Sequence, residues 1–214
     1  MDIVTAKSFI QSLDLRGTPR NLISQGAAED AGEIFDQAKN QARVVGSGVF
    51  SFAQGVDAQV REAISDSALL AQLVANKRTS VASDPIAWFA AYTEVLQNVG
   101  WTLQDTGWTD YTNQGIAAEV NEKIVEVMSV ALGPSPAALA LINATMNALK
   151  AMSANGPWIT LFSRESQKAT ISRFQVGLVE KDPQAEVFVS LLSEYETVKG
   201  RDIPLVSFGD INRQ

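Results

Sequence analysis

The clearest hydrophobic pattern in the chain is helical and begins at Asp84 and Pro85. An aspartate carboxylate accepts hydrogen bonds from the free N–H groups at a helix start. Proline suits the first helical position because the N–H that it lacks would have no partner within the helix. At about 100° per residue, one side of the segment gathers its large apolar side chains, which are Trp88, Tyr92, Val95, Leu96 and Val99. Gly100 allows the left-handed geometry of a helix end. The pattern predicts a central amphipathic helix over 85–99.

The same periodicity predicts five further helices. They cover the N-terminal segment up to Leu13 and the ranges 27–45, 56–76, 115–132 and 136–153. In the last of these, Asn143, Asn147 and Lys150 form one narrow polar stripe, which predicts a helix buried on most sides. Between the second and third helices, the glycine-rich stretch 44–55 lacks the third glycine and the lysine of a phosphate-binding loop. We interpret it as a bent connector that places Phe50 and Phe52 in the core.

From Gly156 onward the period of the pattern changes to that of strands. The alternation predicts strands at 158–162, 170–179 and 186–192, with a hairpin turn at 181–184, and a last strand over 203–208. Pro204 places this last strand at a sheet edge, because proline cannot donate to a ladder. The passage 101–115 between the helices is polar and aromatic, and we interpret it as a loop. The predicted fold is a single α+β domain, in which about six N-terminal helices (1–154) pack on a small C-terminal antiparallel sheet (155–214).

Composition supports a globular protein and excludes several kinds of chemistry. The 214 residues are 46% apolar and 19% charged, with a net charge of −7. An acidic chain without a basic cluster is a poor ligand for nucleic acid. The chain has no cysteine and no histidine, so Ser-His-Asp and Cys-His catalysis and thiolate metal sites are excluded. We predict no catalytic residue, no metal site and no cofactor.

The N-terminus lacks the basic start, apolar run and small-residue cleavage site of a secretory signal. We therefore expect the chain to be made in the cytoplasm. Export without a leader, or release on lysis, stays open as an alternative.

A first candidate surface is the uncharged run from Val127 to Leu149, which the Gly133-Pro134-Ser135-Pro136 turn divides into two arms. One interpretation is a helical hairpin that enters a bilayer, as in a leaderless bacterial toxin or effector, and the other is an ordinary buried hairpin. A spanning helix needs about 20 apolar residues, and each arm is shorter. The residues predicted to contact a membrane are Val127, Val130, Leu132, Leu139, Leu141, Ile142 and Met146.

A second candidate surface is the aromatic and acidic passage that contains Trp101, Asp105, Trp108, Asp110 and Tyr111. Flat rings beside carboxylates suit a sugar or a polar headgroup. The alternative is that both tryptophans turn inward and clamp the helix ends. Asp105 and Asp110 could also serve as the acid and base of a glycoside hydrolase if their carboxyl groups stood about 5 to 9.5 Å apart.

These patterns favour a non-enzymatic protein that works by association. Its partner would be another protein or a second copy, reached through the sheet edge, or a membrane, reached through the apolar hairpin. A carboxylate-based hydrolase or a sugar-binding protein that uses the 101–111 passage is the alternative.

Overall fold

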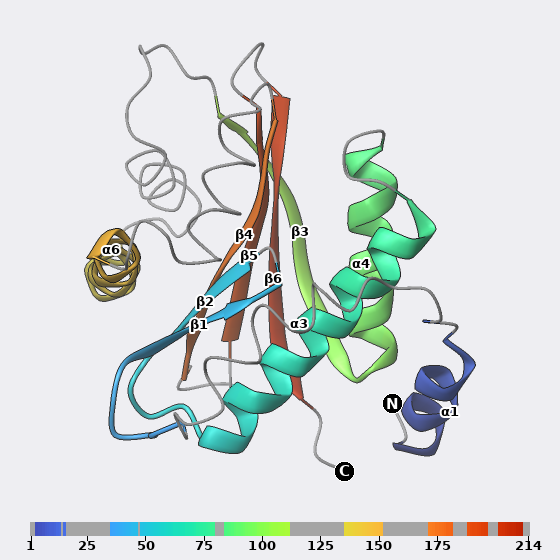
Figure 1. The fold of residues 1–214 in the computed structure, drawn as a ribbon, viewed down its shortest axis with the longest axis horizontal. Coiled ribbons are helices and arrows are strands. Elements are labelled where there is room, and N and C mark those ends of the chain that lie inside the picture. The colour runs from blue at the N-terminus through green and yellow to red at the C-terminus, as the bar shows by residue number, and fades with distance from the viewer. Residues whose placement is uncertain are drawn as a thin grey trace.

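The computed structural model describes residues 3–13, 15, 35–46, 48–79, 84–111, 135–151, 171–181, 188–196 and 201–211. The helices are α1 (Ile3–Ser12), α3 (Ala58–Arg78), α4 (Pro85–Asn98) and α6 (Pro136–Ala151). The strands are β1 (Gln41–Val45), β2 (Gly48–Phe52), β3 (Trp101–Tyr111), β4 (Ile171–Glu180), β5 (Phe188–Glu196) and β6 (Arg201–Ile211). Figure 1 shows α6 on one side of the sheet and α3, α4 and α1 on the other.

All of the described strands belong to one sheet with the order β1-β2-β4-β5-β6-β3. β2 and β4 run parallel, and the other neighbours run antiparallel. The predicted fold class is therefore wrong, although the described part of the chain is α+β. It contains four helices rather than a bundle of six, and its sheet is mixed rather than antiparallel. The sheet also takes strands from both halves of the chain, so no helical layer precedes a separate strand layer.

The helices α3 and α4 confirm the periodicity and the end signals. Asp84 accepts a hydrogen bond from the N–H of Ala87 at 2.9 Å, and Pro85 begins α4. Gly100 has a φ of 107°, so the chain turns there as only glycine does without strain. α4 packs against α3, α1 and β3, which confirms its central position. Of the predicted apolar stripe of α4, Trp88, Tyr92, Val95 and Leu96 are buried, and Val99 is half-buried.

A β-hairpin and the turn before it take the place of residues 35–45 of the predicted helix 27–45, and the hairpin also replaces the predicted connector 44–55. Residues 27–34 lie outside the described residues. Residues 41–45 are β1 and residues 48–52 are β2, with Val45 paired to Gly48 across a two-residue turn. Gly46 has a φ of 57°, which fits the turns that connect tightly linked strands. The prediction that Phe50 and Phe52 are buried is confirmed, but a strand rather than a loop carries them.

The passage 101–111 is β3, not a loop, and it pairs along its length with β6. β6 therefore lies between β5 and β3, so the predicted edge position of the last strand is wrong. Pro204 fits an interior strand because the ladder with β5 stops at the Leu192–Leu205 pair, and Pro204 pairs only with Trp108 of β3. The open ends of the described sheet are β1 and β3.

The two faces of the sheet bury different helices. Phe50, Phe52 and Val179 belong to the core that α3 and α4 cover. Ser51, which points to the opposite face, shares a buried 2.8 Å hydrogen bond with Thr145 of α6. The strands β2 and β4 are thus covered on both faces, as parallel strands usually are.

α6 confirms the predicted helix 136–153 but is not buried on most sides. Its buried residues form one face, and Asn143, Ala144, Asn147 and Ala148 are exposed.

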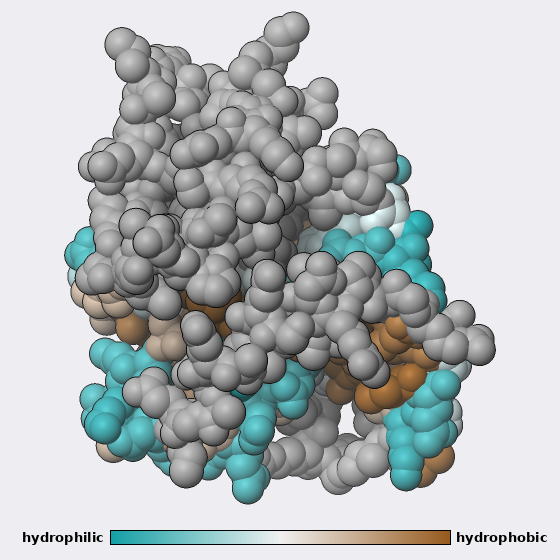
Figure 2. Space-filling view, viewed as in Figure 1, coloured by the Kyte–Doolittle hydropathy of each residue, from teal (hydrophilic) through white to brown (hydrophobic). Residues whose placement is uncertain are grey.

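Near the N-terminus, Figure 2 shows hydrophobic atoms at the right of the molecule, over the region where Figure 1 draws α1 beside α4. Phe9 of α1 and Leu13, which follows α1, pack against the core.

The predicted strands at 170–179 and 186–192 are confirmed as β4 and β5, which pair antiparallel. The predicted helix 115–132, the predicted strand 158–162 and residues 182–184 of the predicted turn lie outside the described residues.

Candidate functional site

The five residues of the predicted aromatic and acidic surface all lie in β3, at one end of the sheet. Trp101 is only 6% exposed and belongs to the core beside α4, so its ring is not a face on which a ligand can stack. Trp108, Asp110 and Tyr111 are paired in register with Pro204, Asp202 and Arg201 of β6. The structure therefore arranges these residues along a strand rather than around a loop.

Asp105 and Asp110 lie five residues apart in β3. At about 3.4 Å per residue, their backbone positions are about 17 Å apart along the strand. This separation is larger than the 5 to 9.5 Å between the carboxyl groups of a glycoside hydrolase. The strand by itself does not bring the two residues together as an acid and a base.

Some of the residues predicted to contact a membrane lie in α6, and the others lie outside the described residues. Val127, Val130 and Leu132 lie outside the described residues. In α6, Leu139 is half-buried, and Leu141, Ile142 and Met146 are buried. A membrane contact through these three side chains would require α6 to leave the sheet. No helix within the described residues combines the length and apolar character of a transmembrane span.

No group of three or more acidic side chains that could hold a metal ion occurs in the described ranges. A further candidate within the described residues is the backbone edge of the sheet at β1.

The hydrogen-bond pattern of β2 determines which backbone groups of β1 face outward. The N–H of Ala53 donates to the carbonyl of Val179 at 2.8 Å, so alternate residues of β2 face β4 and the residues between them face β1. Phe50 is one of the latter, and its partner in β1 is Arg43. The N–H and C=O groups of Ala42 and Val44 therefore point away from β2.

These outward groups form an open sheet edge. Among the described residues, β1 pairs only with β2. The outward N–H and C=O groups of Ala42 and Val44 have no hydrogen-bond partner there. Ala42 is exposed and Val44 is half-buried. A row of free N–H and C=O groups is a template on which another strand can pair.

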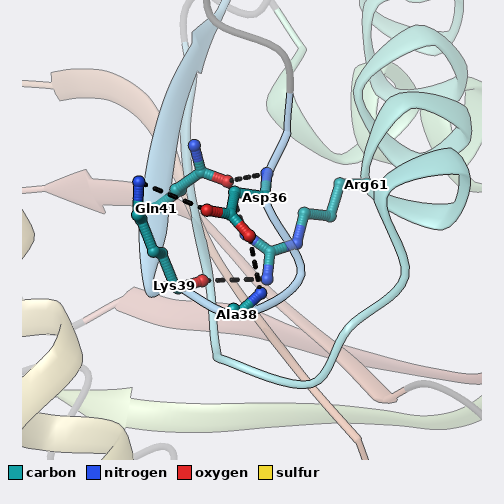
Figure 3. A network of polar contacts seen from close by, with 5 residues as sticks. All are labelled: Asp36, Ala38, Lys39, Gln41 and Arg61. Atoms are coloured by element: carbon teal, nitrogen blue, oxygen red, sulfur yellow. Dashed lines mark hydrogen bonds and ion pairs between the residues drawn. The ribbon is translucent and has the colours of Figure 1, made fainter.

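Arg61 of α3 holds the segment that leads into β1 (Figure 3). Its side chain is fully buried and donates to the carbonyls of Val56, Lys39 and Ala53 at 2.9 to 3.0 Å. A fourth bond joins Arg61 to the side-chain oxygen of Gln41 at 2.9 Å. Burial lowers the pKa of the guanidinium, and the charge of Asp36 opposes this shift. Arginine keeps its charge in such sites, so one cation fixes both ends of the β1–β2 hairpin.

The same Gln41 oxygen accepts the N–H of Asp36 at 2.7 Å, which extends the network to the turn before β1. The Asp36 carboxylate accepts the N–H of Ala38 at 2.9 Å and pairs with Lys39 at 3.2 Å. These two contacts, in this order, lower the pKa of Asp36 from its ordinary value of 3.8. The turn is therefore ordered by a charge as well as by the backbone.

Asp36→Asn is expected to destabilise the protein slightly at neutral pH and to have no effect in strong acid. The carboxylate is a stronger acid in the folded chain, so its contribution is present above pH 3.8 and is lost as the pH falls through the lower, folded pKa. Urea unfolding of both proteins over this range measures the difference. A deficit that is the same at neutral and at strongly acid pH would assign the effect to hydrogen-bond geometry instead of charge.

The sequence contained a signal for this edge that the helical interpretation of 27–45 missed. Gln-Ala-Arg-Val-Val and Gly-Val-Phe-Ser-Phe are rich in β-branched and aromatic residues and flank the two-residue sequence Gly46-Ser47. Such a spacing is typical of a hairpin. The chain matches no family model, no curated protein and no solved structure.

Proposed function

We propose that this protein is an association module, and that it binds an extended segment of another protein as an added strand beside β1. The observation that carries the proposal is the outward direction of the N–H and C=O groups of Ala42 and Val44. In an antiparallel addition, each of these residues exchanges two hydrogen bonds with the residue opposite. Four backbone bonds then form without any change in the sheet, which is the usual chemistry of strand addition.

The rigidity of β1 supports this proposal. A binding edge loses less conformational freedom on association when it is already ordered. The Arg61 bonds hold the chain on both sides of the hairpin. Gly46 also lies against Gln72 of α3, where any larger residue would meet the Gln72 side chain, and Gln72 donates to the carbonyl of Val45 at 3.1 Å. Both ends of the five-residue strand are thus attached to α3.

The membrane hypothesis is the competing form of association. It requires the buried face of α6 to separate from β2 and to break the hydrogen bond between Ser51 and Thr145. Strand addition at β1 requires no such step, which is why we favour it. Dye release from anionic and neutral liposomes decides between them, because only the membrane hypothesis predicts release.

The test of strand addition uses a synthetic peptide, acetyl-Thr-Val-Thr-Val-Thr-amide, at millimolar concentration. When its two valines pair with Ala42 and Val44, the amide protons of these two residues are expected to exchange with solvent more slowly. The amide protons of Arg43 and Val45 already face β2 and are expected to change little. The same peptide with both valines N-methylated lacks the facing donors and is expected to give no protection. Protection by the methylated peptide would contradict the proposal.

Ala42→Pro is expected to abolish peptide binding while the fold is kept. Proline removes the outward N–H of residue 42, and no bond to β2 depends on that group. Ala42→Thr keeps the N–H and is the matched control, for which binding is expected to be unchanged. Fluorescence polarisation of the labelled peptide measures binding, and circular dichroism checks the fold. If Ala42→Pro binds as the native protein does, the added strand does not use this edge.

A further inference from the structure

Arg43 occupies the centre of the proposed binding edge and determines what kind of strand can pair there; this inference rests on the proposed function. Arg43 lies between the two outward-facing residues and pairs with Phe50 of β2. Its guanidinium stands 5.3 Å from the centre of the Phe35 ring, and Phe35 packs edge-on against Phe52 at 5.2 Å. The cation is therefore held on the face of the sheet that α3 covers, beside the open edge.

The described residues around Arg43 do not neutralise its charge. Within the part of the chain that the structure describes, the carboxylates form ion pairs with Lys39 and Arg78 but not with Arg43. The aromatic contact with Phe35 leaves the positive charge in place. An added strand would bring its own residue directly opposite this charge.

A second copy of the chain is a poor partner for this edge. Symmetric antiparallel pairing that sets Ala42 of each copy opposite Val44 of the other centres on Arg43, which places two guanidinium groups opposite one another. Like charges at directly opposed positions destabilise a strand pair. Centring the pair on Val44 instead places Ala42 opposite Gly46, whose φ of 57° takes it out of the strand conformation. Arg43 thus disfavours edge-to-edge assembly of the protein, as charged residues on edge strands commonly do.

We propose that the partner is an extended antiparallel segment of another protein, with an aspartate or glutamate opposite Arg43. The flanking residues of this segment pair with Ala42 and Val44 through their backbones. A carboxylate opposite the guanidinium gains a cross-strand ion pair, whereas a lysine there meets a like charge. The net charge of −7 of the whole chain repels a strongly acidic tail at long range. The segment is therefore an apolar or β-branched strand with one central acid rather than an acidic tract.

The experiment compares three peptides that differ only at the residue opposite Arg43. They are acetyl-Thr-Val-Glu-Val-Thr-amide, the lysine analogue and the neutral threonine peptide that tests strand addition. The native protein is expected to bind the glutamate peptide about tenfold more tightly than the lysine peptide, with the threonine peptide between them. The preference is expected to shrink as salt is added, because the pair is close to solvent.

Two variants assign the preference to Arg43. Arg43→Gln keeps most of the side-chain length without the charge and is expected to bind all three peptides about equally. Arg43→Glu is expected to prefer the lysine peptide. Equal binding of the three peptides by the native protein, with loss of binding on N-methylation, would overturn the acidic partner and leave strand addition intact. Failure of every peptide to bind would instead overturn the proposed function itself.

Discussion

Arg61→Ala is expected to lower the free energy of unfolding by about 4 kcal/mol. The guanidinium donates four hydrogen bonds inside the protein, and its removal leaves three buried or half-buried backbone carbonyls without this donor. Each unsatisfied acceptor costs about 1 to 3 kcal/mol, and partial entry of water recovers some of that loss. Urea unfolding followed by tryptophan fluorescence measures the change.

Arg78→Ala is the matched control for Arg61→Ala, since it removes the same side chain from the same helix. Arg78 pairs with Glu94 at the surface, where both side chains are more than 40% exposed. Such a pair contributes less than about 1 kcal/mol, because water solvates both ions when it is broken. A loss at Arg61 as small as that at Arg78 would mean that the hairpin does not depend on the buried cation.

Arg61→Ala is also expected to make the binding edge at β1 open more easily. The bonds from Arg61 to Lys39 and Gln41 hold the chain where it enters β1. Without them, the amide protons of Arg43 and Val45, which face β2, should lose more protection from exchange than those of β4, because local opening is then easier than global unfolding. An equal loss of protection in the two strands would show that Arg61 stabilises the whole protein and not the edge in particular.

The parts of the fold that the sequence predicted correctly are those determined by local signals. α4 has its aspartate cap, its proline and its terminal glycine within about 17 residues of one another, so no distant contact is needed to define it. α3 likewise shows its predicted stripe, which includes Val60, Ile64 and Ala71, at helical spacing. In both helices local preference and tertiary packing favour the same structure.

The parts that the sequence did not predict depend on pairing between distant segments. β3 has glycine and aspartates that are typical of a loop, and it is a strand because β6, about 100 residues away in the chain, pairs with it. Pro204 suggested an edge strand, but the edge is occupied by β3. The alternation of β1 covers only five residues, which is too short to distinguish a strand from the end of a helix. Register and strand order are non-local properties, and one sequence contains little information about them.

The candidate site was missed for a related reason. Sequence motifs for catalysis or metal binding consist of side chains, whereas the β1 edge consists of backbone groups on Ala42 and Val44. Arg61 is the sequence signal that could have indicated the ordered hairpin beside α3, because it is the charged residue on the buried stripe of that helix. A buried arginine requires several acceptors, and the carbonyls of a nearby turn are common acceptors.

Gly177→Ala is expected to destabilise the protein by about 1 to 3 kcal/mol, the usual range for an overpacked core. Gly177 of β4 lies beside Phe50 of β2 in the parallel pair. A Cβ atom built on Gly177 would stand 2.3 Å from Cδ1 of the Phe50 ring, which is much closer than two carbon atoms can approach. Phe50 is fully buried between the sheet and α3, so the ring has little room to move. The strand pair or the ring must therefore shift.

A double-mutant cycle with Phe50→Val separates this clash from any other effect of the substitution. Valine lacks the ring atoms that approach Gly177 most closely, although Phe50→Val itself is expected to destabilise the core. In that background Gly177→Ala is expected to be neutral or stabilising by up to about 1 kcal/mol, because alanine loses less backbone freedom on folding than glycine does. The sign of the effect at residue 177 is thus expected to depend on residue 50. If Gly177→Ala costs the same in both backgrounds, β2 and β4 are not in contact in this register. The binding edge at β1, which is attached to the sheet through β2, would then have a different position from the one on which the proposed function rests.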